Sequence, residues 1–440
     1  MATDFVYGML PDLLLLVLVI VLMLLEMLRA DARWARVAFI AFGVAALGAL
    51  LDQLNGGFAA ELVQRQVMVD SFAVLGKTVL LLCGLGVALG FGVARGYKFW
   101  LLAAASTLGG MLMVESSGFA TLFLGIELLS LPAFALIVHG QGRSSASEGA
   151  FKYLVLSSVA SALVLFGISL AYGLSGTLLT LAWASDFAYG GMQAKAAGLL
   201  VIAGLFLKAA VFPFHAWAPD AYAAARMPVT ALMASLVKAA VVLALVRILA
   251  SFPLDAACMA VITGLAIVSI VFGNVAALGQ GRFKRLLAYS SVAHAGYMIF
   301  ALTDTTGSRA TDLLWYTAFY GLATVLACAS FAALSPDDDD LRALDGKFAT
   351  QPVASILLAI AVLSLAGLPP LPGFFAKLFV FKSVVASGHL VPAVIAFVGS
   401  FLGLAYYVGI VMRLFQAAPQ QATGSEPMTD SMRAREKAPA

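Results

Sequence analysis

Long apolar segments recur along almost the whole chain and are separated by short polar ones. Their centres lie near residues 20, 44, 81, 106, 129, 163, 205, 240, 268, 293, 322, 368 and 403. A helix needs about 20 apolar residues to cross a bilayer. The pattern therefore predicts an all-α fold, a polytopic transmembrane helical bundle with about 13 spans.

Composition supports this class and excludes others. Of the 440 residues, 62% are hydrophobic and only 11% are charged, which is more apolar sequence than a soluble core needs. The net charge of +3 is too small to indicate a nucleic-acid partner. Cys83, Cys258 and Cys328 lie in apolar runs without metal-ligand spacing, so we expect small core residues and no metal site.

Charges between the runs predict an orientation. Basic residues gather after the odd-numbered spans. They are Arg29, Arg33, Arg36, Arg95, Lys98, Arg143, Arg282, Lys284, Arg285, Arg342, Lys347, Arg433, Arg435 and Lys437, whereas the opposite loops offer Arg65, Lys195 and Arg309. By the positive-inside rule, we expect the N-terminus outside and the C-terminal tail in the cytoplasm. The first run has acidic residues before it and basic ones after it, so it indicates a retained helix and not a secretory signal.

Prolines interrupt two of the spans, and these two lie five spans apart. One breaks at Pro213, shortly after Lys208, and the other breaks within 367–373, just before Lys377. Proline removes a backbone donor and clashes with the preceding turn, so each helix must open. This arrangement is typical of two inverted five-helix repeats with an ion path at the breaks, although two unrelated kinks would give the same pattern.

The predicted organisation follows from these breaks. We expect N-terminal transmembrane helices over 1–95, a first repeat over 96–252 and a second over 253–416. A polar, disordered cytoplasmic tail is predicted for 417–440. The acidic run at 337–340 is expected to be a solvated loop or, alternatively, a contact for a basic partner.

Several ionisable residues lie where hydrocarbon would otherwise surround them. Lys208 and Lys238 interrupt two apolar helices, and Glu127 has no other charge for about ten residues on either side. Charge within a membrane is costly and marks an ion pathway by default. The alternatives are a lysine that extends to the headgroups and a glutamate that forms a packing ion pair.

Other candidates lie nearer the ends of spans or on their polar faces. Lys152 opens the sixth span, where it either extends to the interface or serves the path. His294 lies ten residues after Lys284, about 15 Å along a helix and near mid-membrane; a buried core histidine is the alternative. Lys284 is expected at the cytoplasmic end, as an anchor or a proton uptake site, and His215 follows a helix break.

Several motifs resemble one known family, the antiporter-like membrane subunits of respiratory complex I and of Mrp-type antiporters. They are GIELLSLPAFAL, FKYL, PFHAWAPDAY, MPVTALMASLVKAA, FKRLLAYSSVAHAGYMI and LAGLPPLPGFFAKLFVF. The likeness covers roughly 116–302 and 363–381. Two departures are plain: Ala225-Arg226-Met227 replaces the usual Gly-Ala-Pro, and a polar tail replaces a fourteenth helix.

The resemblance implies roles for these residues. In the family, the glutamate matching Glu127 pairs with the lysine matching Lys208, and the residue matching Lys152 bridges neighbouring pairs. Protons would then move through water towards Lys238, His294 and Lys377, with His215 and Lys284 as further candidates. At an effective dielectric near 20, a charge pair at 4 Å is worth about 4 kcal/mol, so making or breaking the glutamate contact would load or empty the lysine.

The resemblance also implies a setting. We expect a subunit of a proton-translocating NADH:quinone oxidoreductase in the bacterial inner membrane, beside other antiporter-like subunits. The chain itself is expected to hold no cofactor, with NADH, FMN, iron–sulfur clusters and quinone used in other subunits. The alternatives are a subunit of an Mrp-type cation/proton antiporter or membrane-bound hydrogenase, and a structural membrane subunit that conducts nothing.

Overall fold

A computed structural model describes residues 2–29, 31–91, 96–139, 144–183, 191–252, 255–336 and 338–416. These residues are almost entirely helical. The elements are α1 (Ala2–Gly8), α2 (Leu10–Met27), α3 (Arg33–Asn55), β1 (Ala60–Leu62), β2 (Val67–Val69), α4 (Ser71–Gly90), α5 (Tyr97–Glu115), α6 (Phe119–Val138), α7 (Ser144–Ser175), α9 (Gly191–Lys208), α10 (Trp217–Ala224), α11 (Met227–Leu232), a π-helical turn η1 (Met233–Val237), α12 (Lys238–Ser251), α13 (Ala256–Leu278), α14 (Phe283–Ala301), α15 (Arg309–Leu334), a 3-10 turn η2 (Leu341–Leu344), α16 (Lys347–Thr350), α17 (Pro352–Ala366), α18 (Pro372–Ala386) and α19 (Leu390–Phe415). The expected tail at 417–440 lies outside the described residues.

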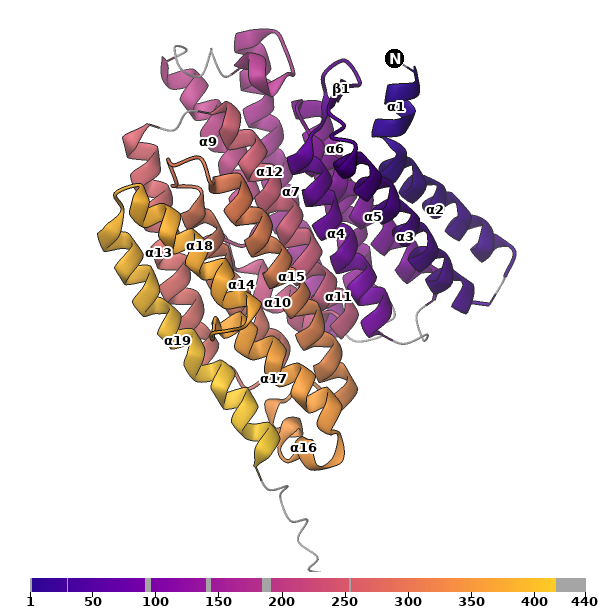
Figure 1. The fold of residues 1–440 in the computed structure, drawn as a ribbon, viewed down its shortest axis with the longest axis vertical. Helices are drawn as coiled ribbons and strands as arrows, with labels where there is room; N and C mark the ends of the chain where they lie inside the picture. Colours follow the sequence, from indigo (N-terminus) through magenta and orange to yellow (C-terminus); the bar gives the residue numbers. More distant parts are fainter. Residues whose placement is uncertain are drawn as a thin grey trace, which may run out of the picture.

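The predicted all-α membrane bundle is confirmed. In the described chain, 11 helices are long and apolar enough to cross a membrane. The two remaining expected spans are α14, which carries several polar residues, and the broken pair α17 and α18, each 15 residues long. Figure 1 shows these helices side by side, with α2 and α3 towards one end and α13 and α19 towards the other.

One membrane helix is enclosed by protein on every side. It consists of α11, η1 and α12, and its apolar window is 100% buried. Helices α4, α5, α9, α14 and α15 all pack against α12. By contrast, only 28% of the corresponding window of α2 and 33% of that of α19 is buried. The molecule therefore has a central helix and peripheral helices whose outer faces are apolar.

The two spans in which breaks were predicted both open there. The chain leaves α9 after Lys208, and Ala210 takes a left-handed conformation with φ 57° before the short helix α10 begins. In the second case, α17 ends at Ala366, the next residue Gly367 is also left-handed with φ 84°, and α18 begins at Pro372. Each opening places a lysine beside backbone groups that no longer bond within a helix.

Helix pairs in the two halves pack in a similar way. Helix α5 lies against α6, and α13 lies against α14. In both pairs a glycine allows close approach: a Cβ at Gly109 would lie 2.4 Å from the nitrogen of Leu129, and one at Gly273 would lie 2.5 Å from that of Ala293. Such contacts between small residues are typical of membrane helices.

The acidic run contacts a basic loop of the same chain. Asp339 lies 3.8 Å from the Lys284 ammonium and 4.0 Å from Arg282. Its carbonyl oxygen accepts a hydrogen bond from the Phe283 amide, and Asp340 caps the η2 turn. The described part of this run is therefore held by the chain's own residues and is not simply a solvated loop.

Candidate functional site

Lys208 is a buried lysine held by hydroxyl groups. It is the last residue of α9, where the helix opens, and only 6% of it is exposed. Its ammonium donates to the Oγ of Ser130 on α6, at 2.8 Å, and to the Oγ of Ser157 on α7, at 2.9 Å. The proline-broken helix thus places the lysine between α6 and α7.

Glu127 does not contact Lys208 directly. Its carboxylate accepts a short hydrogen bond from Ser161, and it makes no ion pair in the described chain. Ser161 and Ser157 lie one turn apart on α7, so one helix holds both members of the expected pair. The two groups are therefore close neighbours separated by serine hydroxyls, and the direct pairing that the resemblance implies is not present in this state.

A small cavity lies beside Lys208. Its lining includes Ser130, Tyr153, Trp217, Val237 and Val241. The free volume of about 10 Å³ is close to what one water molecule needs. Since the two valines flank Lys238 in sequence, this cavity extends from the first lysine towards the central helix.

Lys238 lies at the end of the π-helical turn on the central helix. It is 3% exposed, and its ammonium donates a short hydrogen bond to the backbone oxygen of Ser291 on α14. The Ser291 hydroxyl lies 3.5 Å from that of Tyr222 on α10. The π turn was not predicted; such turns are rare within α-helices and are frequent at functional sites.

His294 lies one turn after Ser291 on α14. Its Nδ1 lies 2.9 Å from the hydroxyl of Tyr316, and its ring lies 4.7 Å from that of Tyr320. A second small cavity, again of about 10 Å³, is lined by these residues and by Ser364 and Ala376. His294 therefore lies between the central helix and the second helix break.

Lys377 occupies the second break. Its ammonium donates to the carbonyl of Ala366, the last residue of α17, at 2.8 Å, and to the Oγ of Ser400 on α19, at 2.9 Å. It also lies 5.1 Å from the centre of the Tyr297 ring. The carbonyl is one of those that a helix end leaves without an intrahelical partner, so the break both exposes it and supplies the lysine's acceptor.

The three lysines share one property. In the described chain, Lys208, Lys238 and Lys377 are all buried, and none forms an ion pair with a carboxylate. Their partners are hydroxyl and carbonyl oxygens. The sequence pattern predicted the three lysines but not the serine hydroxyls that bond Lys208 and Lys377.

Lys152 and Lys284 bond to groups around the short helix α10, and not to the residues that hold the three buried lysines. Lys152 bonds to Glu148, at 2.7 Å, and to Asp220 on α10, at 2.8 Å, and 43% of its side chain is exposed. Lys284 donates to the carbonyls of Ala223 and Ala225 at the end of α10, each at 2.9 Å. Both lysines thus anchor α10: Lys152 bonds Asp220 in its first turn, and Lys284 lies at its C-terminal end, where a basic residue is stabilising.

His215 packs among aromatic rings in the first break. It stacks on Phe212, with ring centres 5.4 Å apart, and lies 4.6 Å from Phe272. Neither contact joins it to Lys208 or to the central helix. As for metals, the described residues contain no group of three or more His, Cys, Asp or Glu side chains that could hold an ion.

Comparison with known proteins gives a consistent result. Residues 116–403 match the family described as "NADH:quinone oxidoreductase/Mrp antiporter, TM". A protein of Pelobacter propionicus named "NADH-quinone oxidoreductase subunit N" is 52% identical over 419 residues, which is 95% of this chain and 90% of the relative.

Solved structures agree with the sequence matches. A chain in the structure of respiratory complex I from Thermus thermophilus is similar with a TM-score of 0.83 and 33% identity, covering 93% of this chain and 91% of that one. A chain of the Mrp complex from Dietzia sp. has a TM-score of 0.84 at 23% identity, covering 95% and 81%. The second likeness concerns the fold alone.

Proposed function

This chain belongs to the family of membrane subunits shared by NADH:quinone oxidoreductases and Mrp antiporters, and we propose that it is subunit N of a bacterial NADH–quinone oxidoreductase and moves protons across the membrane. Its likeness to relatives of that name over nearly the full length supports the assignment. The lysine after the second break agrees with it, because several antiporter-like subunits carry a glutamate at the position of Lys377, whereas subunits N and L carry lysine.

One observation carries the transport proposal: the buried lysines are bonded to groups that suit both of their protonation states. A serine hydroxyl accepts a hydrogen bond from an ammonium and can donate one to a neutral amine. Lys208 has two such partners and Lys377 has one. A lysine fixed to a carboxylate would be held in its charged form. The hydroxyl partners leave Lys208 and Lys377 free to gain and lose a proton, and Lys238 bonds to an uncharged backbone oxygen that likewise does not fix its charge.

Glu127 is placed to bias the first lysine. Its carboxylate and the Lys208 ammonium are both held by serines one turn apart on α7. A small movement of α7 or α9 that brings the two charges into contact would favour the charged lysine by about 4 kcal/mol at an effective dielectric near 20. Release of that contact would free the proton to pass towards Lys238, His294 and Lys377.

The setting follows from the same assignment. The chain would work within a multi-subunit membrane complex beside other antiporter-like subunits in the bacterial inner membrane. Oxidation of NADH and reduction of quinone would take place in other subunits, with their FMN and iron–sulfur clusters, and this subunit would hold no cofactor of its own. We also propose the two inverted repeats, 96–252 and 253–416, on the support of the two breaks and the matching helix pairs.

Removal of either member of the Glu127 and Lys208 pair tests the function. Glu127→Ala and Lys208→Ala should each assemble and yet lower the number of protons pumped per NADH, with the lysine variant at least as impaired. Lys195→Ala is the matched control, because this lysine lies on the same helix α9 in an exposed pair with Asp255.

The measurement is proton uptake and NADH oxidation, recorded together in membrane vesicles. Assembly is followed by the amount of intact complex that is purified. If either test variant pumped as many protons per NADH as the wild type, Glu127 and Lys208 would have only a structural role, and the proposed control of Lys208 by Glu127 would be wrong. Antiporter activity without NADH oxidation in the wild type would favour the cation/proton antiporter alternative.

A further inference from the structure

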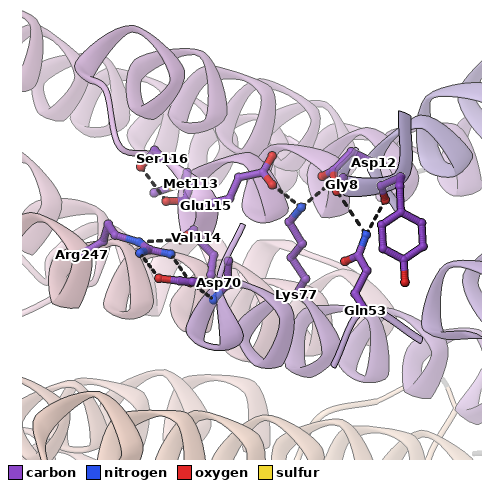
Figure 2. A network of polar contacts seen from close by, with 12 residues as sticks. Gly8, Asp12, Gln53, Asp70, Lys77, Met113, Val114, Glu115, Ser116 and Arg247 are labelled. Atoms are coloured by element: carbon purple, nitrogen blue, oxygen red, sulfur yellow. Dashed lines mark hydrogen bonds and ion pairs between the residues drawn. The ribbon is translucent and has the colours of Figure 1, made fainter. Parts of the chain in front are cut away.

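Three ionisable side chains meet in the N-terminal helices, outside the row of lysines. The Lys77 ammonium on α4 lies 2.6 Å from the Asp12 carboxylate on α2, and it also contacts the Glu115 carboxylate at the end of α5. No more than 4% of any of the three side chains is exposed. Figure 2 shows the ammonium between the two carboxyl groups. We call these residues the N-terminal triad.

The triad contains one more acid than base. If all three groups were ionised, it would carry a net charge of −1 in a place without solvent. Isolated buried charge is very costly, and in practice such a site takes up a compensating ion or proton. Oδ1 of Asp12 and both oxygens of Glu115 are buried without a hydrogen bond, and of these three only Oε2 of Glu115 has a charged partner, the Lys77 ammonium. Both features indicate that something positive and small belongs there.

The neighbouring charged residues do not supply the missing positive charge. Arg247 on α12 comes nearest, because its Nε donates to the backbone oxygen of Val114, beside Glu115. Its two terminal nitrogens, however, bond both oxygens of Asp70 at 2.7 and 2.8 Å, so that pair is neutral by itself. Gln53 on α3 carries no charge, and its amide nitrogen bonds backbone oxygens of α1.

A proton fits the site better than a metal ion. The Lys77 ammonium already occupies the position between the carboxylates that a cation would need. A proton requires no further space, and it would turn one unpartnered carboxylate oxygen into a hydroxyl donor while the other remains an acceptor. The remaining carboxylate and the ammonium would then form a neutral ion pair.

We propose that Asp12, Lys77 and Glu115 form a second proton-binding site, in which the two carboxyl groups share one exchangeable proton across the lysine. The site lies near the membrane face on which the chain begins. Asp12 is in the first turn of α2, Glu115 is the last residue of α5, and Lys77 lies six residues into α4, about 9 Å from its start. Exchange with water on that face needs only a short opening.

The site is joined to the central helix. Arg247 lies nine residues after Lys238 on α12, about 13 Å along the axis. Its contacts with Val114 and Asp70 link α12 to the ends of α5 and α4, next to the triad. A shift of α12 therefore alters the surroundings of Glu115. The binding of the proton itself does not depend on pumping by the buried lysines.

Infrared difference spectroscopy of the intact purified complex at neutral pH tests the site without turnover. A protonated carboxyl group has a C=O stretching band that shifts in D2O. Glu115→Gln and Asp12→Asn each leave one acid and one base, so both should assemble and each should lose one such band. Glu61→Gln, which removes an exposed acid paired with Arg65 on the same side of the protein, should lose only a carboxylate band.

The outcomes are distinct. Loss of a protonated band in both triad variants supports the shared proton. Loss of only carboxylate bands would mean that both acids are ionised and would overturn the proposal, and so would a sodium-dependent band in the wild type. Failure of both variants to assemble also contradicts it, because a triad that already holds a proton should tolerate a neutral amide of the same shape.

Discussion

At the scale of single residues, the nature of a lysine's partner separates two kinds of buried charge. Lys77 is fixed between two carboxylates, whereas Lys208, Lys238 and Lys377 bond only to hydroxyl and carbonyl oxygens in the described chain. An ion pair holds a charge in place, and a hydroxyl tolerates both protonation states. The partner, more than the depth of burial, indicates which lysines are suited to transport.

Lys377→Arg separates charge from proton exchange. Arginine keeps the positive charge and its donors but almost never releases its proton. The variant should therefore assemble normally and lose most of its proton yield. Proton uptake and NADH oxidation are measured together in membrane vesicles. Full pumping would make Lys377 a structural cation, and the path would have to end elsewhere.

At the scale of helices, the openings decide where the lysines lie. Ser364 on α17 and Gly373 on α18 meet closely at the second break: the Gly373 amide donates to the Ser364 hydroxyl at 3.0 Å. A Cβ at Gly373 would lie only 1.8 Å from the Ser364 carbonyl oxygen, where no side chain fits. Lys377 follows one turn later, so this contact sets its position relative to α17.

Gly373→Ala should displace the start of α18. The clash costs about 1–3 kcal/mol, as is typical of overpacking, and it moves Lys377 away from the Ala366 carbonyl. We expect a lower melting temperature and a reduced proton yield. Gly409→Ala on α19 is the control, because no atom lies within 4 Å of its Cβ and helix propensity favours alanine there. If the two variants had the same melting temperature and the same proton yield, this interpretation of the contact would be wrong.

The prolines explain which parts of the helices were predictable. Pro213 and the prolines of 369–372 act locally, so the sequence predicts both breaks. The π turn before Lys238 and the serine contacts of Lys208 depend on how helices distant in sequence pack. A local sequence pattern does not predict such packing. Glu127 was recognised with its expected partner, yet the intervening Ser161 became visible only in the structure. Lys77 and Glu115 were not predicted because each lies near the end of its helix, where a charge at the interface is ordinary, and their meeting depends on how α2, α4 and α5 pack.

At the scale of the whole molecule, the buried ionisable residues lie within a largely apolar core, and the outer faces of the bundle are apolar as well. The outer faces of α2, α3 and α19 carry exposed large hydrophobic side chains, among them Ile20, Val44 and Phe401. Lipid or neighbouring subunits of a membrane complex would cover these faces. The basic loop before α14 lies at one end of the bundle, with Asp339 packed against it.

Cysteine labelling tests the orientation of the whole chain. Gly281→Cys lies in the basic loop and Gly424→Cys in the tail, and the positive-inside rule places both in the cytoplasm. A membrane-impermeant thiol reagent added to intact cells should therefore leave both unlabelled and should label them after the cells are opened. If both cysteines were labelled in intact cells, either the predicted orientation or the predicted number of spans would be wrong.

The enclosure of the central helix has a consequence for the order of synthesis. Residues 227–251 leave the ribosome before α13–α19 exist, so one side of α12 first faces lipid or the translocation machinery. Lys238 then lacks its acceptor, because the Ser291 carbonyl belongs to α14. A lysine at the centre of a membrane helix costs about 2.5–3.5 kcal/mol on insertion scales, which the apolar residues around it offset. A chain that stops after Ser251 would leave Lys238 without its acceptor and exposed to lipid. We expect membrane proteases to degrade such a chain, whereas the complete protein buries this lysine.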